Sequence, residues 1–214
     1  MKRHRRAGID EIEWIDDFVS ERARTSILSE LEYCFWWPSL VVSRDADGGW
    51  RSGRSDWRAS ETTTERWFTL QLMTEVRRIE RRVERILGEP PDCFEGWQAT
   101  RYGPGQYFDD HYDFGHCRDE PAGERRATLV LYLRCPAGGG GTHFPERDLT
   151  VAARPGRLLF FRNLLPDGSE DMAMLHASLP VRRGRKLTLV NWIRERPVRG
   201  ARANSIRATE ERRP

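Results

Sequence analysis

The second half of the chain constrains the fold most strongly, because short strand-like runs follow one another there with turn residues between them. The runs are "FEGWQATRY" (94–102), "RATLVLYLR" (126–134), "RLLFFRN" (157–163) and "KLTLVNWI" (186–193), and Gly, Pro and Asp residues separate them. Short strands at this spacing are typical of an antiparallel sandwich or barrel. The sequence therefore predicts a mainly β fold.

Two helices are predicted before these strands. The first begins after Ser20, a favourable N-cap residue, and the second lies within 66–91, where apolar residues recur at helical spacing until Gly88. Residues 36–43 are predicted to form a strand, and the Gly/Ser/Asp/Arg-rich stretch 44–66 is predicted to be a long loop of the kind that forms lids. We expect the two helices to flank the β core.

The length of 214 residues suits one domain with its own hydrophobic core. We expect a single domain over residues 1–195, with a helical N-terminal part (1–91) and a β core (92–195). The remaining residues, 196–214, are rich in arginine and poor in apolar residues, so they are predicted to be a basic, mobile tail.

Composition narrows the class of protein. The formal net charge is only +3, with acidic and basic residues interspersed, so nucleic acid is an unlikely main partner. No apolar run reaches the length of a membrane span, and the four cysteines form no C-x-x-C pair, which favours reduced thiols and a cytoplasmic location. The sequence leaves the oligomeric state open.

The stretch "DDHYDFGHC" (109–117) contains a candidate metal motif. If it is a strand, His111 and Asp113 point to the same face, because alternate residues of a strand share a face. A third ligand must come from elsewhere in the chain. The histidines that follow are His116, His143 and His176. The apolar surroundings of His176 in "MAMLHASLPV" indicate either a buried structural histidine or a ligand.

Two histidines and one carboxylate form the facial triad of non-haem Fe(II) oxygenases, which leaves coordination positions open for substrates. A structural zinc site is normally closed by four ligands, often thiolates, and the four cysteines are not clustered for that purpose. The motif therefore favours an iron site of this kind over a structural zinc site.

Lys186 gives a second indication. It shares a strand face with Thr188, Val190 and Trp192, and a lysine on the core face of a sandwich needs an anionic partner. A carboxylate of 2-oxoglutarate would supply that anion. In the alternative register Leu187 fills the core and Lys186 faces outward, and periodicity alone leaves both registers open.

Several segments between residues 94 and 195 together resemble the prolyl 4-hydroxylase-like family of Fe(II)/2-oxoglutarate dioxygenases. In order along the chain they are "EGWQATRYGPGQYFDDHYDF", "RRATLVLYL", "GGGGTHFP", "PGRLLFFRNLLPDGSEDMAMLHASLPVRRGRK" and "LVNWIRER". The resemblance implies a double-stranded β-helix, or jelly-roll, core. The stretch "RSGRSDW" (51–57) is only faintly similar to the family's loop over the substrate.

The resemblance also implies roles for individual residues. His111, Asp113 and His176 would be the iron ligands, and Lys186 would pair with the distal carboxylate of 2-oxoglutarate. Residues expected in the same co-substrate pocket are Tyr102, Thr142 and Thr188. Those expected to face the substrate are Arg125 and Trp192, with the adjacent Arg126 as the alternative arginine.

The function implied is hydroxylation of an unactivated C–H bond in a peptidyl side chain, with proline as the first candidate. Such an enzyme consumes O2 and 2-oxoglutarate, releases succinate and CO2, and is commonly assayed with ascorbate as reductant. Asp113 favours hydroxylation over halogenation, because a halogenase needs that coordination position for chloride. Trp50, Trp57 and Tyr107 are either groove aromatics for a peptide or ordinary packing residues.

Three other functions stay open at this point. One is hydroxylation of a free amino acid or a small natural-product intermediate. Another is a non-catalytic jelly-roll module that binds a ligand or partner. The basic ends of the chain leave a nucleic-acid demethylase as the third.

Overall fold

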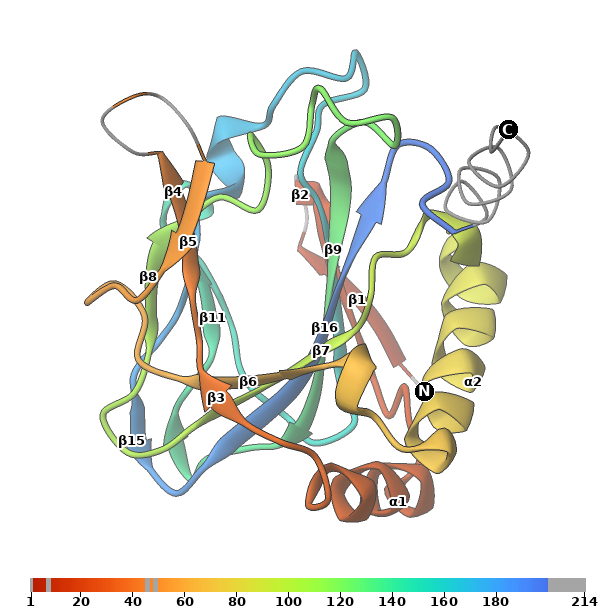
Figure 1. Cartoon of the computed structure of the whole chain (residues 1–214), viewed down its shortest axis with the longest axis vertical. Coiled ribbons are helices and arrows are strands. Elements are labelled where there is room, and N and C mark those ends of the chain that lie inside the picture. Colours follow the sequence, from red (N-terminus) through yellow and green to blue (C-terminus); the bar gives the residue numbers. More distant parts are fainter. Residues whose placement is uncertain (1, 7–8, 45–46, 48–49, 200–214) are drawn as a thin grey trace, which may run out of the picture.

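The computed structural model describes residues 2–6, 9–44, 47 and 50–199. A large antiparallel sheet and a smaller one pack face to face, and helices α1 and α2 cover the outer side of the large sheet (Figure 1). The fold is mainly β with a double-stranded β-helix core, so the predicted fold class is confirmed. No helix in the described part of the chain has the length and apolar character needed to cross a lipid bilayer.

The large sheet has eight strands. In spatial order they are β1 (Lys2–Arg6), β2 (Ile9–Asp16), β13 (Leu158–Arg162), β9 (Arg125–Arg134), β16 (Lys186–Arg194), β7 (Gln98–Tyr102), β6 (Glu61–Thr64) and β3 (Trp37–Pro38).

The small sheet has four strands. In spatial order they are β12 (Leu149–Val151), β11 (Thr142–Phe144), β14 (His176–Ser178) and β8 (Phe108–His111). Two further strand pairs are β4 (Val41–Arg44) with β5 (Trp50–Gly53), and β10 (Gly138–Gly139) with β15 (Val181–Arg183). The short 3-10 helices are η1 (Glu65–Trp67), η2 (Pro91–Cys93), η3 (Pro145–Arg147) and η4 (Met172–Met174).

Both predicted helices form, the first beginning after Ser20 and the second ending at Gly88 as the sequence indicates. In α1 (Glu21–Leu31) the Ser20 hydroxyl accepts a hydrogen bond from a first-turn amide, and Thr69 does the same for α2 (Leu70–Leu87). Gly88 ends α2 in the left-handed conformation, with φ at 76°, where glycine lacks the Cβ that strains other residues. The apolar faces of both helices then pack on the large sheet.

Strand alternation in the large sheet separates two environments. On β9 and β16, Leu129, Leu131 and Leu189 point outward into the core beneath the helices. Tyr132 points inward, into a second apolar cluster between the two sheets that also contains Phe144 and Phe161. Leu187 lies in the core beneath the helices, as the alternative register expects, but Lys186 on the other face of β16 is buried between the sheets and does not face outward.

The N-terminal part, 1–91, is less helical than the sequence suggests. Strand β2 pairs with β13, and the basic strand β1 pairs with β2, where His4 lies 3.1 Å from Asp16. Cross-strand pairing between the basic first segment and an acidic neighbour stabilises these strands, and only the tertiary fold supplies the partner. The stretch 44–66 likewise forms β5 and β6, so it is not one long loop.

The predicted tail begins as ordered structure. The Arg196 and Val198 amides donate hydrogen bonds to the carbonyls of Ala122 and Asp92, and the Arg199 guanidinium lies 2.8 Å from the buried Glu80 carboxylate. The prediction of mobility is therefore wrong for residues 196–199. The rest of the predicted tail, 200–214, lies outside the described residues.

Candidate active site

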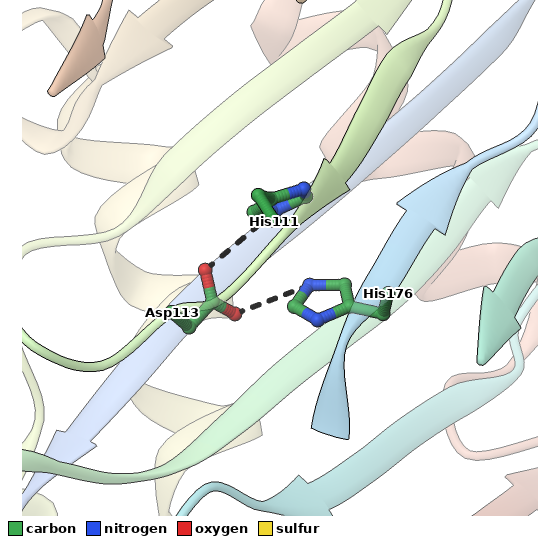
Figure 2. Close-up of side chains that lie close together, drawn as sticks. All are labelled: His111, Asp113 and His176. Atoms are coloured by element: carbon green, nitrogen blue, oxygen red, sulfur yellow. Dashed lines mark ion pairs between the residues drawn. The ribbon is translucent and has the colours of Figure 1, made fainter. Parts of the chain in front are cut away.

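Three potential ligand residues meet at one end of the small sheet. His111 and His176 are cross-strand partners on β8 and β14, and Asp113 follows β8 by two residues (Figure 2). The Asp113 carboxylate lies 3.9 Å from His111 Nε2 and 3.5 Å from His176 Nε2. One potential ligand atom from each residue lies within 4.8 Å of the others, so the three can bind one ion.

A bulge in β8 determines which side chains enter the site. His176 pairs with His111 but Ser178 pairs with Phe108, so β8 has one more residue than β14 over this interval. The extra residue lets Phe108 and His111 face the same side, and their rings stack with centroids 3.6 Å apart. Asp113 lies past the end of the strand, so strand alternation is not the reason that it meets His111.

Backbone carbonyls set the tautomer of both imidazoles. His111 Nδ1 lies 2.7 Å from the Asp109 carbonyl and His176 Nδ1 lies 3.0 Å from the Met174 carbonyl. A carbonyl only accepts hydrogen bonds, so each Nδ1 carries the proton and each Nε2 presents a lone pair. Burial, followed by the neighbouring His176, lowers the pKa of His111 to about 3, which keeps this imidazole neutral.

The Asp113 carboxylate is oriented by a buried chain of hydrogen bonds. The Thr128 hydroxyl donates to Asp113 Oδ2 at 2.8 Å, and Asn163 Nδ2 donates to that hydroxyl at 3.0 Å. Burial alone would raise the pKa of Asp113, but His176 and His111 hold the pKa below its ordinary value. The carboxylate is therefore an anion fixed in one orientation.

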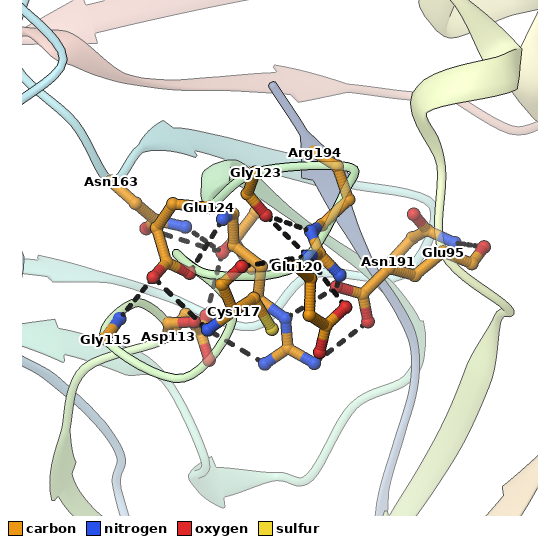
Figure 3. Close-up of polar contacts among 12 residues, drawn as sticks. Glu95, Asp113, Gly115, Cys117, Glu120, Gly123, Glu124, Asn163, Asn191 and Arg194 are labelled. Atoms are coloured by element: carbon orange, nitrogen blue, oxygen red, sulfur yellow. Dashed lines mark hydrogen bonds and ion pairs between the residues drawn. The ribbon is translucent and has the colours of Figure 1, made fainter. Parts of the chain in front are cut away.

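A second set of contacts holds the turn after Asp113. The buried Glu124 carboxylate accepts hydrogen bonds from the Gly115 and Arg125 amides at 2.9 and 2.8 Å (Figure 3). The Arg125 guanidinium forms a two-pronged ion pair with Glu95, with N–O distances of 2.8 and 2.9 Å. These contacts anchor the turn to β9 and so help to hold Asp113 in place.

The donor set fits ferrous iron. Two neutral imidazole nitrogens and one carboxylate oxygen converge from one side, which matches the facial triad and leaves the other side open. A closed structural zinc site needs a fourth ligand, and the described residues add no further histidine, cysteine or carboxylate to this cluster.

Lys186 lies in the same cavity as the triad and is almost fully buried, with 2% of its surface exposed. Its Nζ donates to the Ser178 hydroxyl at 2.7 Å and lies 5.0 Å from the centre of the Tyr102 ring. Burial lowers the pKa of Lys186 to about 7, and no acidic side chain of the described residues pairs with it. Such an ammonium is stabilised by an anionic ligand.

The other residues predicted for the co-substrate pocket line this cavity too. Tyr102, Thr142 and Thr188 all face into it. The Thr142 hydroxyl lies 2.6 Å from the hydroxyl of Tyr132, a buried tyrosine that the sequence analysis missed. The inward alternation of Tyr132 with Thr128 along 126–134 is the signal that would have identified it.

The two residues predicted to face the substrate differ in placement. Trp192 lines the cavity, whereas Arg125 is not among its lining residues. The Arg125 guanidinium lies 4.0 Å from the centre of the Trp192 ring and is bound by Glu95. The adjacent Arg126 pairs instead with Glu89. That Arg125 faces the substrate therefore stays a prediction.

Sequence reasoning overlooked several residues of the cavity. They include Arg58, Gln98, Phe108, Val130 and Ser178. Arg58 lies in a segment that looks like a loop, and no local pattern shows that it pairs with β8. His143, by contrast, bonds Thr150 and stays outside the cavity, as the strand alternation with Thr142 predicts.

The sequence matches the model of a known protein family. The profile of the "2OG-Fe(II) oxygenase superfamily" matches residues 97–194, which include β7, β16 and the whole triad. The resemblance to the prolyl 4-hydroxylase-like family predicted from the sequence is confirmed.

Among curated relatives, prolyl 4-hydroxylase subunit alpha-1 of Gallus gallus is 35% identical over 128 residues, which cover 56% of this chain and 25% of that protein. Prolyl 4-hydroxylase 13 of Arabidopsis thaliana is 33% identical over 134 residues, covering 55% of this chain and 49% of that protein. The chain therefore spans between a quarter and a half of the length of these two relatives.

Among solved structures, the viral collagen prolyl hydroxylase vCPH of Paramecium Bursaria Chlorella virus-1, in its 2OG complex, is 28% identical with a TM-score of 0.65. That match covers 86% of this chain and 96% of the viral chain. A Trichoplax adhaerens prolyl hydroxylase in complex with a hypoxia inducible factor peptide fragment has a TM-score of 0.56 at 16% identity, a likeness of fold alone.

Proposed function

We propose that this chain is a member of the 2OG-Fe(II) oxygenase superfamily and an Fe(II)- and 2-oxoglutarate-dependent hydroxylase that acts on a peptidyl side chain, with proline as the first candidate. One observation carries the proposal. The triad of His111, Asp113 and His176 shares a single cavity with the buried ammonium of Lys186, so a metal and a dicarboxylate can be bound side by side.

When bound, iron(II), 2-oxoglutarate and O2 supply the oxidising chemistry, in which the co-substrate becomes succinate and CO2 and a C–H bond becomes C–OH. The protein's own residues bind and orient the reactants. His111 and His176 present Nε2 lone pairs and Asp113 presents a carboxylate oxygen, all from one side. Lys186, which lines the same cavity, would bind the distal carboxylate of the co-substrate.

Other residues complete the pocket. Tyr102 and Thr142 provide hydroxyl groups beside Lys186, and Thr188 lies on the same strand face. Val130 and Phe108 supply apolar walls, which exclude water from the site. Trp192 lines the cavity and lies over Arg125, where we place the substrate side.

A peptide substrate is supported by two observations. The curated relatives are prolyl 4-hydroxylases, and a surface groove that shares Arg58 with the cavity is lined by residues 38–39, 54–56 and 58–61. The indole of Trp57, predicted as a groove aromatic, is 62% exposed beside this groove, and the Tyr107 hydroxyl binds the Asp56 carbonyl. The side chain of Trp50 is not among those described.

Succinate release tests the proposal directly. We expect the protein to form succinate from 2-oxoglutarate with Fe(II), ascorbate and O2, and to add one oxygen atom to proline-containing peptides, detected by mass spectrometry. His176→Ala should abolish both, whereas His143→Ala should not, because His143 bonds Thr150 outside the cavity. Equal succinate formation by wild type and His176→Ala would contradict the proposal.

The alternatives are less well supported. Free amino acids and natural-product intermediates would be separated from peptides by comparing turnover on each class. A non-catalytic binding module has no need of an open coordination site or of a buried, unpaired ammonium. No succinate with any substrate, and no effect of the His176 variant, would favour that module.

A further inference from the structure

Arg58 connects the cavity of the triad with the surface groove. It lines both the cavity and the groove, and its backbone forms an antiparallel bridge with Phe108 of β8. The amides and carbonyls on either side extend this pairing, since Asp109 bonds the Trp57 carbonyl and Ala59 exchanges hydrogen bonds with Tyr107. Arg58 is therefore held firmly at the point where a substrate would enter.

The guanidinium of Arg58 lies close to the metal ligands. It is 4.5 Å from the centre of the Phe108 ring, and the imidazole of His111 stacks on the same ring with the centroids 3.6 Å apart. These two distances put the guanidinium carbon within about 8 Å of the centre of the His111 ring, a span of two to three residues in an extended peptide. A group bound by Arg58 could therefore belong to a neighbour of the residue that is hydroxylated.

All the hydrogen-bond partners of this guanidinium are neutral. Nε donates to the Ser60 hydroxyl at 3.0 Å, Nη1 to the Leu40 carbonyl at 3.3 Å and Nη2 to the Thr100 hydroxyl at 3.4 Å. No acidic side chain in the described part of the chain forms an ion pair with Arg58. Glu61, which lines the same groove, pairs with Arg101 at 2.8 Å instead.

The remaining donors favour a carboxylate. A guanidinium has five N–H groups, and three are used here, which leaves one on each terminal nitrogen. Two N–H groups on adjacent nitrogens match the two oxygens of a carboxylate, and such bonds are shorter and stronger than neutral ones. Arg58 is half-buried, so water screens the attraction less than at an open surface.

We propose that Arg58 is a specificity residue that binds a carboxylate of the substrate, from an Asp or Glu side chain next to the hydroxylated residue or from the carboxyl end of the substrate. The inference rests on the proposed hydroxylase function and adds the substrate class. The carboxylate of 2-oxoglutarate is the competing source, but Lys186 already provides a buried cation for it, and Arg58 opens onto the groove.

Peptide selection tests this proposal. The protein, loaded with Mn(II) and 2-oxoglutarate without O2, is exposed to a library of proline peptides with each amino acid on either side and with amide or free carboxyl ends. Retained peptides are identified by mass spectrometry. We expect wild type to retain peptides with Asp, Glu or a terminal carboxylate about tenfold better than their amide counterparts, since one charged hydrogen bond corresponds to a factor of that order.

The variants assign the effect to Arg58. Arg58→Gln should lose the preference and Arg58→Glu should reverse it toward Lys and Arg, while Arg22→Gln, which removes an exposed arginine on α1, should retain it. In turnover assays, Arg58→Gln should raise the KM for acidic peptides more than it lowers kcat. Equal retention of acidic and amide peptides by wild type, or a preference unchanged in Arg58→Gln, would overturn the proposal.

Two further measurements separate the explanations. If Arg58→Gln weakens 2-oxoglutarate binding and leaves peptide selection unchanged, Arg58 binds the co-substrate and the proposal is wrong. Succinate formation by wild type without peptide reports the hydroxylase function independently. Succinate formation together with unselective peptide retention would refute the role of Arg58 alone, whereas no succinate with or without any of the peptides would refute the proposed function.

Discussion

Thr128→Val removes one hydroxyl and tests whether the buried chain from Asn163 to Asp113 prepares the metal site. Thr128 and Asn163 are each 1% exposed, so water cannot replace the lost group. Valine has nearly the shape of threonine, so the packing around β9 should change little. The main change is that Asp113 Oδ2 loses a 2.8 Å hydrogen bond.

The size of the effect follows from these contacts. A hydrogen bond to a charged group contributes about 1.5–3 kcal/mol, and each 1.4 kcal/mol is about tenfold in affinity. We therefore expect metal affinity to fall by about 10- to 100-fold, in the range known for residues that orient metal ligands. The Asn163 amide also loses its acceptor, 3.0 Å away, which should lower the free energy of unfolding by about 1–3 kcal/mol.

Isothermal titration with Mn(II), which needs no turnover, measures the affinity, and urea denaturation of the metal-free protein measures stability. Thr128→Ser is the matched control, because it keeps the hydroxyl and removes only a methyl group. Its affinity for Mn(II) should stay within about threefold of wild type, a smaller change than the loss of one charged hydrogen bond would cause. Wild-type affinity in Thr128→Val, or equal losses in the serine and valine variants, would refute the reasoning.

Four further predictions follow, three on Lys186 and one on a glycine. Lys186→Met should abolish measurable 2-oxoglutarate binding, by isothermal titration, while leaving Mn(II) binding within a few-fold. Burial lowers the pKa of Lys186 from 10.5 to about 7, so the buried ammonium lowers the free energy of unfolding. This destabilisation is complete below pH 7 and declines as the pH rises toward 10.5. The gain in unfolding free energy of Lys186→Met over wild type should therefore be largest at pH 6 and shrink at pH 9, and a gain that grows with pH would contradict the assignment. At pH 8, wild type should take up a proton when it binds 2-oxoglutarate. The binding heat should then depend on the ionisation enthalpy of the buffer, and a heat independent of the buffer would exclude this proton uptake. Gly139→Ala should destabilise the protein far more than Gly105→Ala. Both glycines have positive φ, but only a Cβ added at Gly139 would clash with the Pro180 carbonyl oxygen. Equal urea denaturation midpoints for the two variants would contradict this.

The helices and the central strands of the fold could be predicted from the sequence because their signals are local. Caps at Ser20 and Gly88 and an apolar period along 70–87 are contained within each segment. Strands β1 and β2 were not predicted, since β2 is stabilised by pairing with β13, far away in the chain. A short segment with mixed charges carries no local signal for such a partner.

The residues of the site also fall into those that local sequence signals identify and those that depend on the fold. His111, Asp113, His176 and Lys186 could be proposed because each belongs to a recognisable motif and because few other residues have the required chemistry. Their convergence was expected for one wrong reason, since Asp113 lies beyond the strand and is held by Thr128. The resemblance pointed to residues that the structure brings together in one cavity, although the local geometry differs from the predicted one.

By itself the sequence determined the ligand chemistry, the mainly β class and the two helices, because residue type and short-range periodicity are properties of neighbouring residues. Only the tertiary structure decided which way Lys186 faces, where a bulge turns Phe108 toward His111, and that Arg58 reaches the cavity. Those three features depend on the register between strands distant in sequence. Register is set by the packing of whole faces, because a shift of one residue would exchange every inward side chain for an outward one.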